Sequence, residues 1–221
     1  MFVSVGLIHP SADLIPLLTE VAREVMADVD LLHMVDDGML RLIEDAGELT
    51  EPVTRRVCTC ALNAQEAGAE GVMLTSPVIG CAADAARALV RIPVVRIDDA
   101  MAQTAVQFGR SVGVLASRDL TLQATLSLLR EHADAQGRDV ALEPRLCEQA
   151  DRASRGGDLD AYNRIISEEI EALSGNEMIV LADVAMHRAS YALNERVQVP
   201  VLASPRHGFE DLAKKLNYFR R

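Results

Sequence analysis

Two polar residues of different chemistry stand 107 positions apart, and each follows a short apolar run. Ser76 comes directly after Gly71–Thr75, and Asp183 comes just after Met178–Leu181. A partly buried carboxylate can have a raised pKa and act as a base or an acid. A serine hydroxyl is a poor proton acceptor without an adjacent base, but it donates well to a carboxylate or a developing oxyanion. The sequence therefore predicts one acid/base, Asp183, and one residue that orients a substrate, Ser76.

Both residues also have a purely structural interpretation. Asp183 would then cap the helix expected near Arg188 or accept hydrogen bonds from loop amides, and Ser76 would serve as a cap or loop residue.

The same spacing of 107 recurs along the chain without a gap. Five further pairs of residues coincide at this offset: Gly6 with Gly113, Gly68 with Gly175, Glu70 with Glu177, Leu74 with Leu181, and Pro93 with Pro200. Matching glycines, prolines and strand ends together indicate a duplication rather than chance, and a period this long indicates two similar lobes.

Short apolar runs alternate with helical patterns, which is typical of parallel sheets covered by helices. The expected strands are Val3–Ile8, Val29–His33, Gly71–Thr75, Val94–Ile97, Ser111–Leu115, Val140–Glu143, Met178–Leu181 and Val201–Ala203. The expected helices lie near Ala12–Met26, Pro52–Ala67, Ala82–Leu89, Thr121–Ala135, Leu159–Leu173, Arg188–Asn194 and Phe209–Leu216.

The predicted fold is α/β, with two pseudo-symmetric parallel-sheet lobes. One lobe covers residues 1–97 plus a C-terminal helix at 204–221, and the other covers residues 98–203. Ligands of such sheets bind beyond the carboxyl ends of the strands. We therefore expect the active site in a cleft between the lobes, with Ser76 and Asp183 facing it.

Composition narrows the class of protein. The 221 residues carry a formal net charge of -11, which argues against nucleic acid or an anionic membrane as a partner. Neither a signal peptide nor a membrane-spanning run is visible, so we expect a cytoplasmic protein. We also expect the chain to form a homo-oligomer. The four cysteines fit no zinc ribbon and no redox pair, so no metal is expected.

Several segments together resemble the aspartate/glutamate/hydantoin racemase superfamily. They read GLIHPSAD, GAEGVMLTSP, IPVVRIDDAM, SVGVLASRDLT and MIVLADVAM, in the family's order and spacing, and they cover essentially the whole chain. The resemblance implies two α/β lobes and cofactor-free catalysis. One cysteine from each lobe flanks the substrate, so that one removes a proton from the carbon beside a carboxylate and the other returns a proton on the opposite face.

The resemblance puts those two cysteines at Ser76 and Asp183, so this chain departs from the family at both. Cys81, five residues beyond Ser76, is an alternative acid/base, although an ordinary helix residue is the plainer interpretation. Without two thiols, symmetric two-base racemisation loses its symmetry, whereas chemistry that needs one base still fits.

Further candidates to bind substrate lie beside these two positions. Ser11, at the end of the first strand, could hold a carboxylate through its hydroxyl, although it is equally a helix N-cap. In the second lobe, small hydroxylic residues or the guanidinium of Arg118 could do the same, although Arg118 is also interpreted as a solvent-facing side chain. His9 could titrate near neutral pH, although a hydrogen-bonded loop histidine is the plainer interpretation. The candidates are His9, Ser11, Thr75, Pro77, Ser117, Arg118, Thr121 and Val184.

The predicted function is that of a cofactor-independent isomerase, a racemase-like enzyme acting at the carbon next to a carboxylate in an amino acid or hydantoin-like acid. A decarboxylase on the same scaffold and a non-catalytic protein that binds a small acid are the alternatives.

Overall fold

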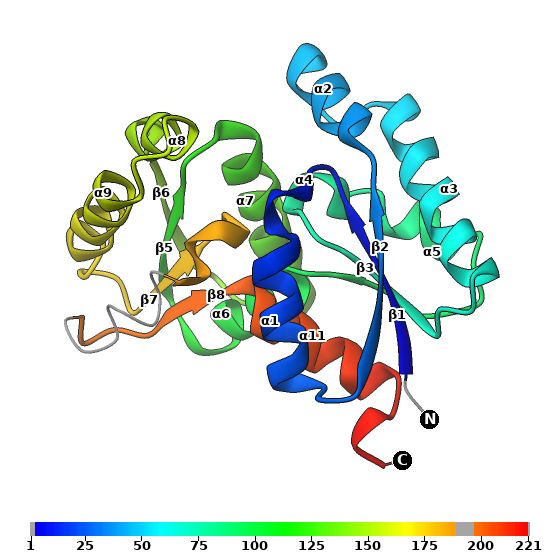
Figure 1. The fold of residues 1–221 in the computed structure, drawn as a ribbon. Coiled ribbons are helices and arrows are strands. Elements are labelled where there is room, and N and C mark those ends of the chain that lie inside the picture. Colours follow the sequence, from blue (N-terminus) through cyan, green and yellow to red (C-terminus); the bar gives the residue numbers. More distant parts are fainter. Residues whose placement is uncertain (1–2, 189–196, 221) are drawn as a thin grey trace. The chain divides into compact units, whose positions relative to one another are not determined.

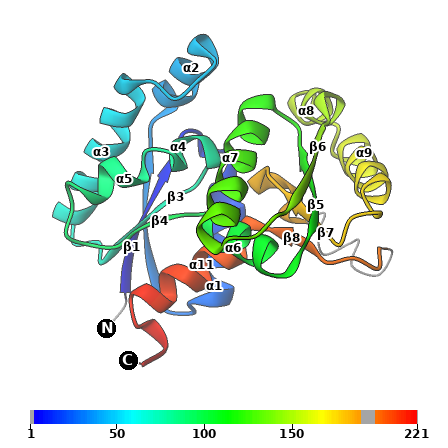
Figure 2. The ribbon, with the colours of Figure 1, turned by 180° about the vertical axis from the view of Figure 1, so that it is seen from behind.

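A computed structural model of the chain describes residues 3–188 and 197–220. It divides into two compact units, one comprising Met1–Asp98 with Pro205–Arg221 and the other Asp99–Ser204 (Figures 1 and 2). Most of the helix predicted near Arg188–Asn194 lies outside the described residues.

The first unit contains one four-stranded parallel sheet in the order β2-β1-β3-β4. Its strands are β1 (Val3–His9), β2 (Val29–Val35), β3 (Gly71–Leu74) and β4 (Val94–Arg96). Its helices and 3-10 turns are η1 (Ala12–Leu14), α1 (Ile15–Val25), α2 (Asp37–Ala46), α3 (Glu51–Glu66), α4 (Pro77–Gly80), α5 (Ala83–Arg87), α11 (Ser204–Lys215) and η3 (Tyr218–Arg220).

Two glycines let helices approach opposite faces of this sheet. A Cβ on Gly6 would lie 2.8 Å from the Cβ of Ala64 on α3. A Cβ on Gly71 would lie 3.0 Å from a methyl carbon of Leu212 on α11. Successive residues of a strand point to opposite faces, and Gly71 pairs with Val5 rather than with Gly6. The sheet is therefore covered by α3 on one face and by the C-terminal helix on the other.

The second unit repeats the plan with the order β6-β5-β7-β8, again all parallel. Its strands are β5 (Ser111–Ala116), β6 (Ala141–Leu146), β7 (Met178–Leu181) and β8 (Val201–Ala203). Its helices and 3-10 turn are α6 (Asp99–Phe108), α7 (Asp119–Gln136), α8 (Glu148–Arg155), α9 (Leu159–Ala172) and η2 (Val184–Met186).

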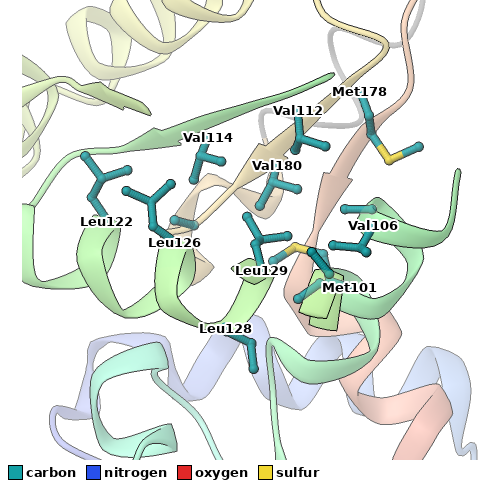
Figure 3. Close-up of a cluster of buried hydrophobic side chains, with 14 of the residues drawn as sticks. Met101, Val106, Val112, Val114, Leu122, Leu126, Leu128, Leu129, Met178 and Val180 are labelled. Carbon is teal, nitrogen blue, oxygen red and sulfur yellow. The ribbon is translucent and has the colours of Figure 1, made fainter. Parts of the chain in front are cut away.

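Alternating strand residues feed two separate cores in the second unit. Val112, Val114 and Val180 pack with α6 and α7, as Figure 3 shows with Leu122, Leu126 and Leu129 of α7. The intervening strand residues pack with α8 and α9 in the other core, and they are Leu115, Ile179 and Leu181. Both faces of the sheet are therefore buried, which explains the continuous apolar runs of β5 and β7.

The pairings of β1 with β3 and of β3 with β4 recur in the second unit at an offset of 107. Val5 pairs with Gly71 and Val112 with Met178, while Val72 pairs with Val94 and Ile179 with Val201. The edge strands β2 and β6 do not keep this offset, since Ser4 pairs with Asp30 but Ser111 with Ala141. The predicted fold class, with two four-stranded parallel sheets of the same topology, is confirmed.

The eight predicted strands are confirmed within a few residues, whereas α2, α4, α6 and α8 were not among the predicted helices. In α8 only Ala150 is buried, so the helix has no apolar stripe to detect. In α2, Gly38 stands in the first turn and only Met39 and Ile43 are buried. No helix among the described residues has the length and apolar character to cross a membrane.

Candidate functional site

Ser76 and Asp183 occupy equivalent positions, each just past the carboxyl end of the central part of its sheet. The N–H of Thr75 donates to the carbonyl of Ile8 at 3.1 Å, and the N–H of Ala182 donates to that of Leu115 at 2.9 Å. Ser76 directly follows Thr75, and Asp183 directly follows Ala182. Each is therefore the first residue after the last of these hydrogen bonds between strands. Ligands of parallel sheets bind at such strand ends.

The carboxyl of Asp183 is buried and only partly satisfied. The residue is 5% exposed. Its Oδ2 accepts a hydrogen bond from the backbone N–H of Ser117 at 2.5 Å. Its Oδ1 is buried without a hydrogen-bond partner among the described residues. Its side chain caps no helix, although it does bind a loop amide, which was one of the structural alternatives. A buried carboxyl with one unpartnered oxygen is an unusual group that needs an explanation.

The surroundings of Asp183 disfavour its charged form. Burial raises the pKa of the Asp183 carboxyl, against the lowering effects of hydrogen bonding to Ser117 and of the Arg118 charge. Tyr162 of α9 is buried close by, and burial together with the Asp183 charge raises the pKa of its phenol. The site can therefore offer a carboxylic acid as well as a carboxylate.

Ser76 lies in a different environment. It is half-buried, has an extended backbone and stands at the N-cap position of the four-residue helix α4, but its hydroxyl makes no capping hydrogen bond. Pro77 is buried at the first position of α4. The structure therefore does not support the alternative in which the Ser76 side chain caps a helix.

The two units differ in the donor that reaches these positions. Ser117, whose N–H holds the Asp183 carboxyl, corresponds to Pro10 at the offset of 107. Proline has no N–H. The first unit therefore lacks the equivalent donor beside Ser76.

The remaining candidates fall into small groups within each unit. In the first unit, Thr75 and His9 are fully buried and joined by a hydrogen bond of 3.0 Å between Oγ1 and Nδ1. Ser11 is the N-cap of η1 and accepts from the N–H of Asp13 at 3.4 Å. In the second unit, Ser117, Thr121 and Val184 are buried, whereas Arg118 is exposed.

Three further residues complete the survey of the site. Cys81 is exposed, and its thiol donates to the carbonyl of Pro77 at a Sγ–O distance of 3.7 Å. Tyr162, whose pKa is raised in part by the Asp183 charge, and His33, which is hydrogen-bonded to His9, were not predicted. Both sit within ordinary apolar patterns, so no sequence signal sets them apart. The described residues contain no group of three or more His, Cys, Asp or Glu side chains that could hold a metal ion.

Comparison with known proteins identifies the family. The family model for Asp/Glu/hydantoin racemases matches residues 5–212. The chain belongs to the Asp/Glu/hydantoin racemase family. Comparison with curated protein sequences gave no match.

Solved racemase-family structures share the fold. Aspartate racemase from Picrophilus torridus superposes with a TM-score of 0.76 at 14% identity, over 97% of this chain and 94% of that one. Allantoin racemase from Klebsiella pneumoniae gives 0.68 at 18% identity, over 98% and 89%. A glycine-to-cysteine mutant of arylmalonate decarboxylase superposes with a TM-score of 0.61 at 17% identity, over 97% of this chain and 93% of that one.

Proposed function

We propose that this racemase-family protein is a cofactor-independent isomerase that moves a proton at the carbon next to the carboxylate of a small acid. Asp183 is the acid/base in this proposal, and Ser76 orients the substrate. The observation that carries it is the buried Asp183 carboxyl, whose Oδ1 has no hydrogen-bond partner among the described residues. In this proposal a bound substrate supplies the hydrogen-bond partner that Oδ1 of Asp183 lacks.

The family and the equivalent strand-end positions of Ser76 and Asp183 in their own units support the choice of these two residues. A raised pKa lets a carboxyl exchange protons with a carbon acid nearer neutral pH than an exposed aspartate can. The amide of Ser117 holds one oxygen in place, which leaves the other to act. Ser117, Arg118 and Thr121 are the proposed carboxylate-binding groups of the second unit, and Val184 would line the site beside Asp183.

In the first unit, Ser76 is the proposed donor to the carboxylate or the developing oxyanion, because a serine hydroxyl is a poor proton acceptor but a good donor. Ser11, Thr75 and Pro77 are proposed to shape the substrate position, and Ser11 can donate its hydroxyl proton while its oxygen accepts from the N–H of Asp13. His9 has both ring nitrogens in hydrogen bonds, so any contact with substrate would require that one of them break.

Solvent exchange tests the proposal directly. The protein is incubated in heavy water with a panel of amino acids and hydantoins, and deuterium uptake at the carbon beside the carboxyl group is followed by proton NMR. Asp183→Asn keeps the size of the side chain but removes proton transfer, so exchange should fall by about a hundred- to ten-thousand-fold. Ser76→Ala should cost up to about a hundred-fold.

The matched control is Asp119→Asn, because Asp119 is an exposed carboxylate of the same unit at the start of α7. It should keep the wild-type rate. Exchange that persists at nearly the full rate in Asp183→Asn would exclude Asp183 as the base.

A decarboxylase on the same scaffold is the second candidate. It is favoured by the presence of only one proposed acid/base and by the structural similarity to arylmalonate decarboxylase. Release of carbon dioxide from substituted malonates, without exchange into amino acids, would select it. A protein that binds these acids but catalyses neither reaction would be the non-catalytic alternative.

A further inference from the structure

Four side chains of the first unit form a continuous chain of hydrogen bonds that ends beside Ser76. The Oγ1 of Thr19 on α1 lies 3.4 Å from Nε2 of His33 on β2. Nδ1 of His33 lies 3.0 Å from Nε2 of His9 at the end of β1. Nδ1 of His9 lies 3.0 Å from Oγ1 of Thr75, whose hydroxyl donates to the carbonyl of Ile8 at 2.8 Å.

The donors and acceptors of this chain can be assigned from its inner end. A carbonyl only accepts, so the single hydroxyl proton of Thr75 points at Ile8. The Thr75 oxygen must then accept from Nδ1 of His9, which therefore carries a proton. Burial, with a smaller contribution from His33, lowers the pKa of His9 to about 4, so its Nε2 is bare at neutral pH and accepts from Nδ1–H of His33. Nε2 of His33 is left to accept from Thr19.

The carbonyl of Ile8, at the inner end, determines whether this chain of hydrogen bonds can transfer protons. A main-chain carbonyl cannot hand a proton on, so the chain is no conduit for protons to a substrate. Its fixed direction does orient every member. The two imidazole rings also stack, with centroids 5.2 Å apart and an angle of 28° between their planes. Three strands and a helix thereby converge on one buried threonine hydroxyl.

We propose that His9 and His33 are positioning residues that hold the Thr75 side chain, and through it the Thr75–Ser76 junction, at the end of β3. This inference rests on the proposed function only in giving Ser76 a role with substrate. The interaction itself is a property of the folded first unit.

Protonation should affect the two imidazoles differently. A proton added to Nε2 of His33 keeps its donation to His9 and only requires that the Thr19 hydroxyl turn round and accept. A proton added to Nε2 of His9 sets two N–H groups against each other and breaks the chain. The groups around the pair are Thr75 and Thr19, both uncharged, and on the outer side Asp36, Arg56 and Cys60, which line a surface hollow with His33. Asp36 and Arg56 form an ion pair of 2.7 Å, so their charges largely offset each other.

Imidazole nitrogen NMR tests this assignment without any substrate. In protein labelled with ¹⁵N-histidine, the five histidines are assigned by single substitutions and their tautomers are read from the nitrogen shifts. We expect His9 and His33 to be neutral with the proton on Nδ1 at pH 7. A proton on Nε2 of His9, or a charged His9 at pH 7, would overturn the inference.

A pair of variants tests the positioning itself. His33→Asn replaces Nδ1 with an amide nitrogen at the same distance along the side chain, whereas His33→Leu removes the donor. The Ser76 amide resonance should move in His33→Leu and return towards its wild-type position in His33→Asn. His132→Leu, in the other unit, is the matched control and should leave it unmoved.

If His33→Leu does not fold, the wild-type titration carries the test, since the Ser76 amide should follow the protonation of His9 with the same midpoint. The proposal would be overturned if the Ser76 amide resonance shifts neither in His33→Leu nor during the titration of His9. Absence of solvent exchange with any acid would instead count against the proposed function and leave the hydrogen-bond chain untouched.

Discussion

The Asp183 carboxyl combines burial, a single amide donor and an unpartnered oxygen, and this combination costs the folded state stability. Because burial raises the folded-state pKa, the native state binds a proton that the unfolded chain has already released above about pH 3.9. Stability therefore falls as pH rises from that value to the folded-state pKa, and it is constant above it.

Asp183→Asn removes this penalty, and the variant should be more stable than the wild type at the alkaline end of that window. Melting temperatures measured from pH 4 to pH 9 should show a gap that opens with rising pH, by about 2–4 °C for each kcal/mol. A gap of constant size would mean that the Asp183 carboxyl does not titrate in this range. Together with lost exchange activity, a gain in stability is the signature of a functional residue kept at a structural cost.

Cys81 allows a second test at the residue scale. Neither proposed reacting position carries sulfur, and the Cys81 thiol is exposed at the end of α4. Alkylation with iodoacetamide should therefore modify Cys81 and leave most of the exchange activity, as Cys81→Ser should also do. Inactivation that parallels alkylation of Cys81 and is absent in Cys81→Ser would transfer the acid/base role to this thiol.

At the scale of elements, Gly6 sets how closely α3 lies on the first sheet. A methyl group there would meet the Cβ of Ala64 at 2.8 Å, and a Cβ has no rotation by which to move away. We expect Gly6→Ala to destabilise the protein by about 1–3 kcal/mol, which is typical of overpacking. Gly175→Ala is the control, because nothing lies within 4 Å of an added Cβ there. Chemical denaturation measures both, and equal effects would show that α3 can shift away.

The elements that could be predicted are those with strong patterns. The strands could be found because apolar runs such as Met178–Leu181 are buried on both faces. The acid/base candidate could be found because Asp183 follows such a run. The orientation of Asp183 could not, since it depends on the amide of Ser117, 66 residues away. Nor could the pairing of His9 with His33, because two neighbouring strands bring them together only in the folded sheet.

At the scale of the whole molecule, the repeat kept its architecture and changed its chemistry. Strand order and the pairing of β1 with β3 match those of β5 with β7 at an offset of 107. The side chains just beyond the strands do not match, since a serine follows one and an aspartate the other. Strand pairing depends on backbone hydrogen bonds and on the burial of strand side chains, so it is the same for these strands although the residues that follow β3 and β7 differ.

The contrast between Pro10 and Ser117 bears on the handedness of the product. The Ser117 amide fixes the Asp183 carboxyl, whereas Pro10 offers no such donor beside Ser76, so the proposed enzyme would return every proton from the same side of a planar intermediate. A chiral substrate would then exchange its hydrogen for deuterium many times before inverting, and optical rotation would decay far more slowly than the proton signal. A prochiral acid would give one enantiomer in excess. In this proposal, an aspartate held by an amide in one unit and a serine without that donor in the other are enough to make proton return one-sided.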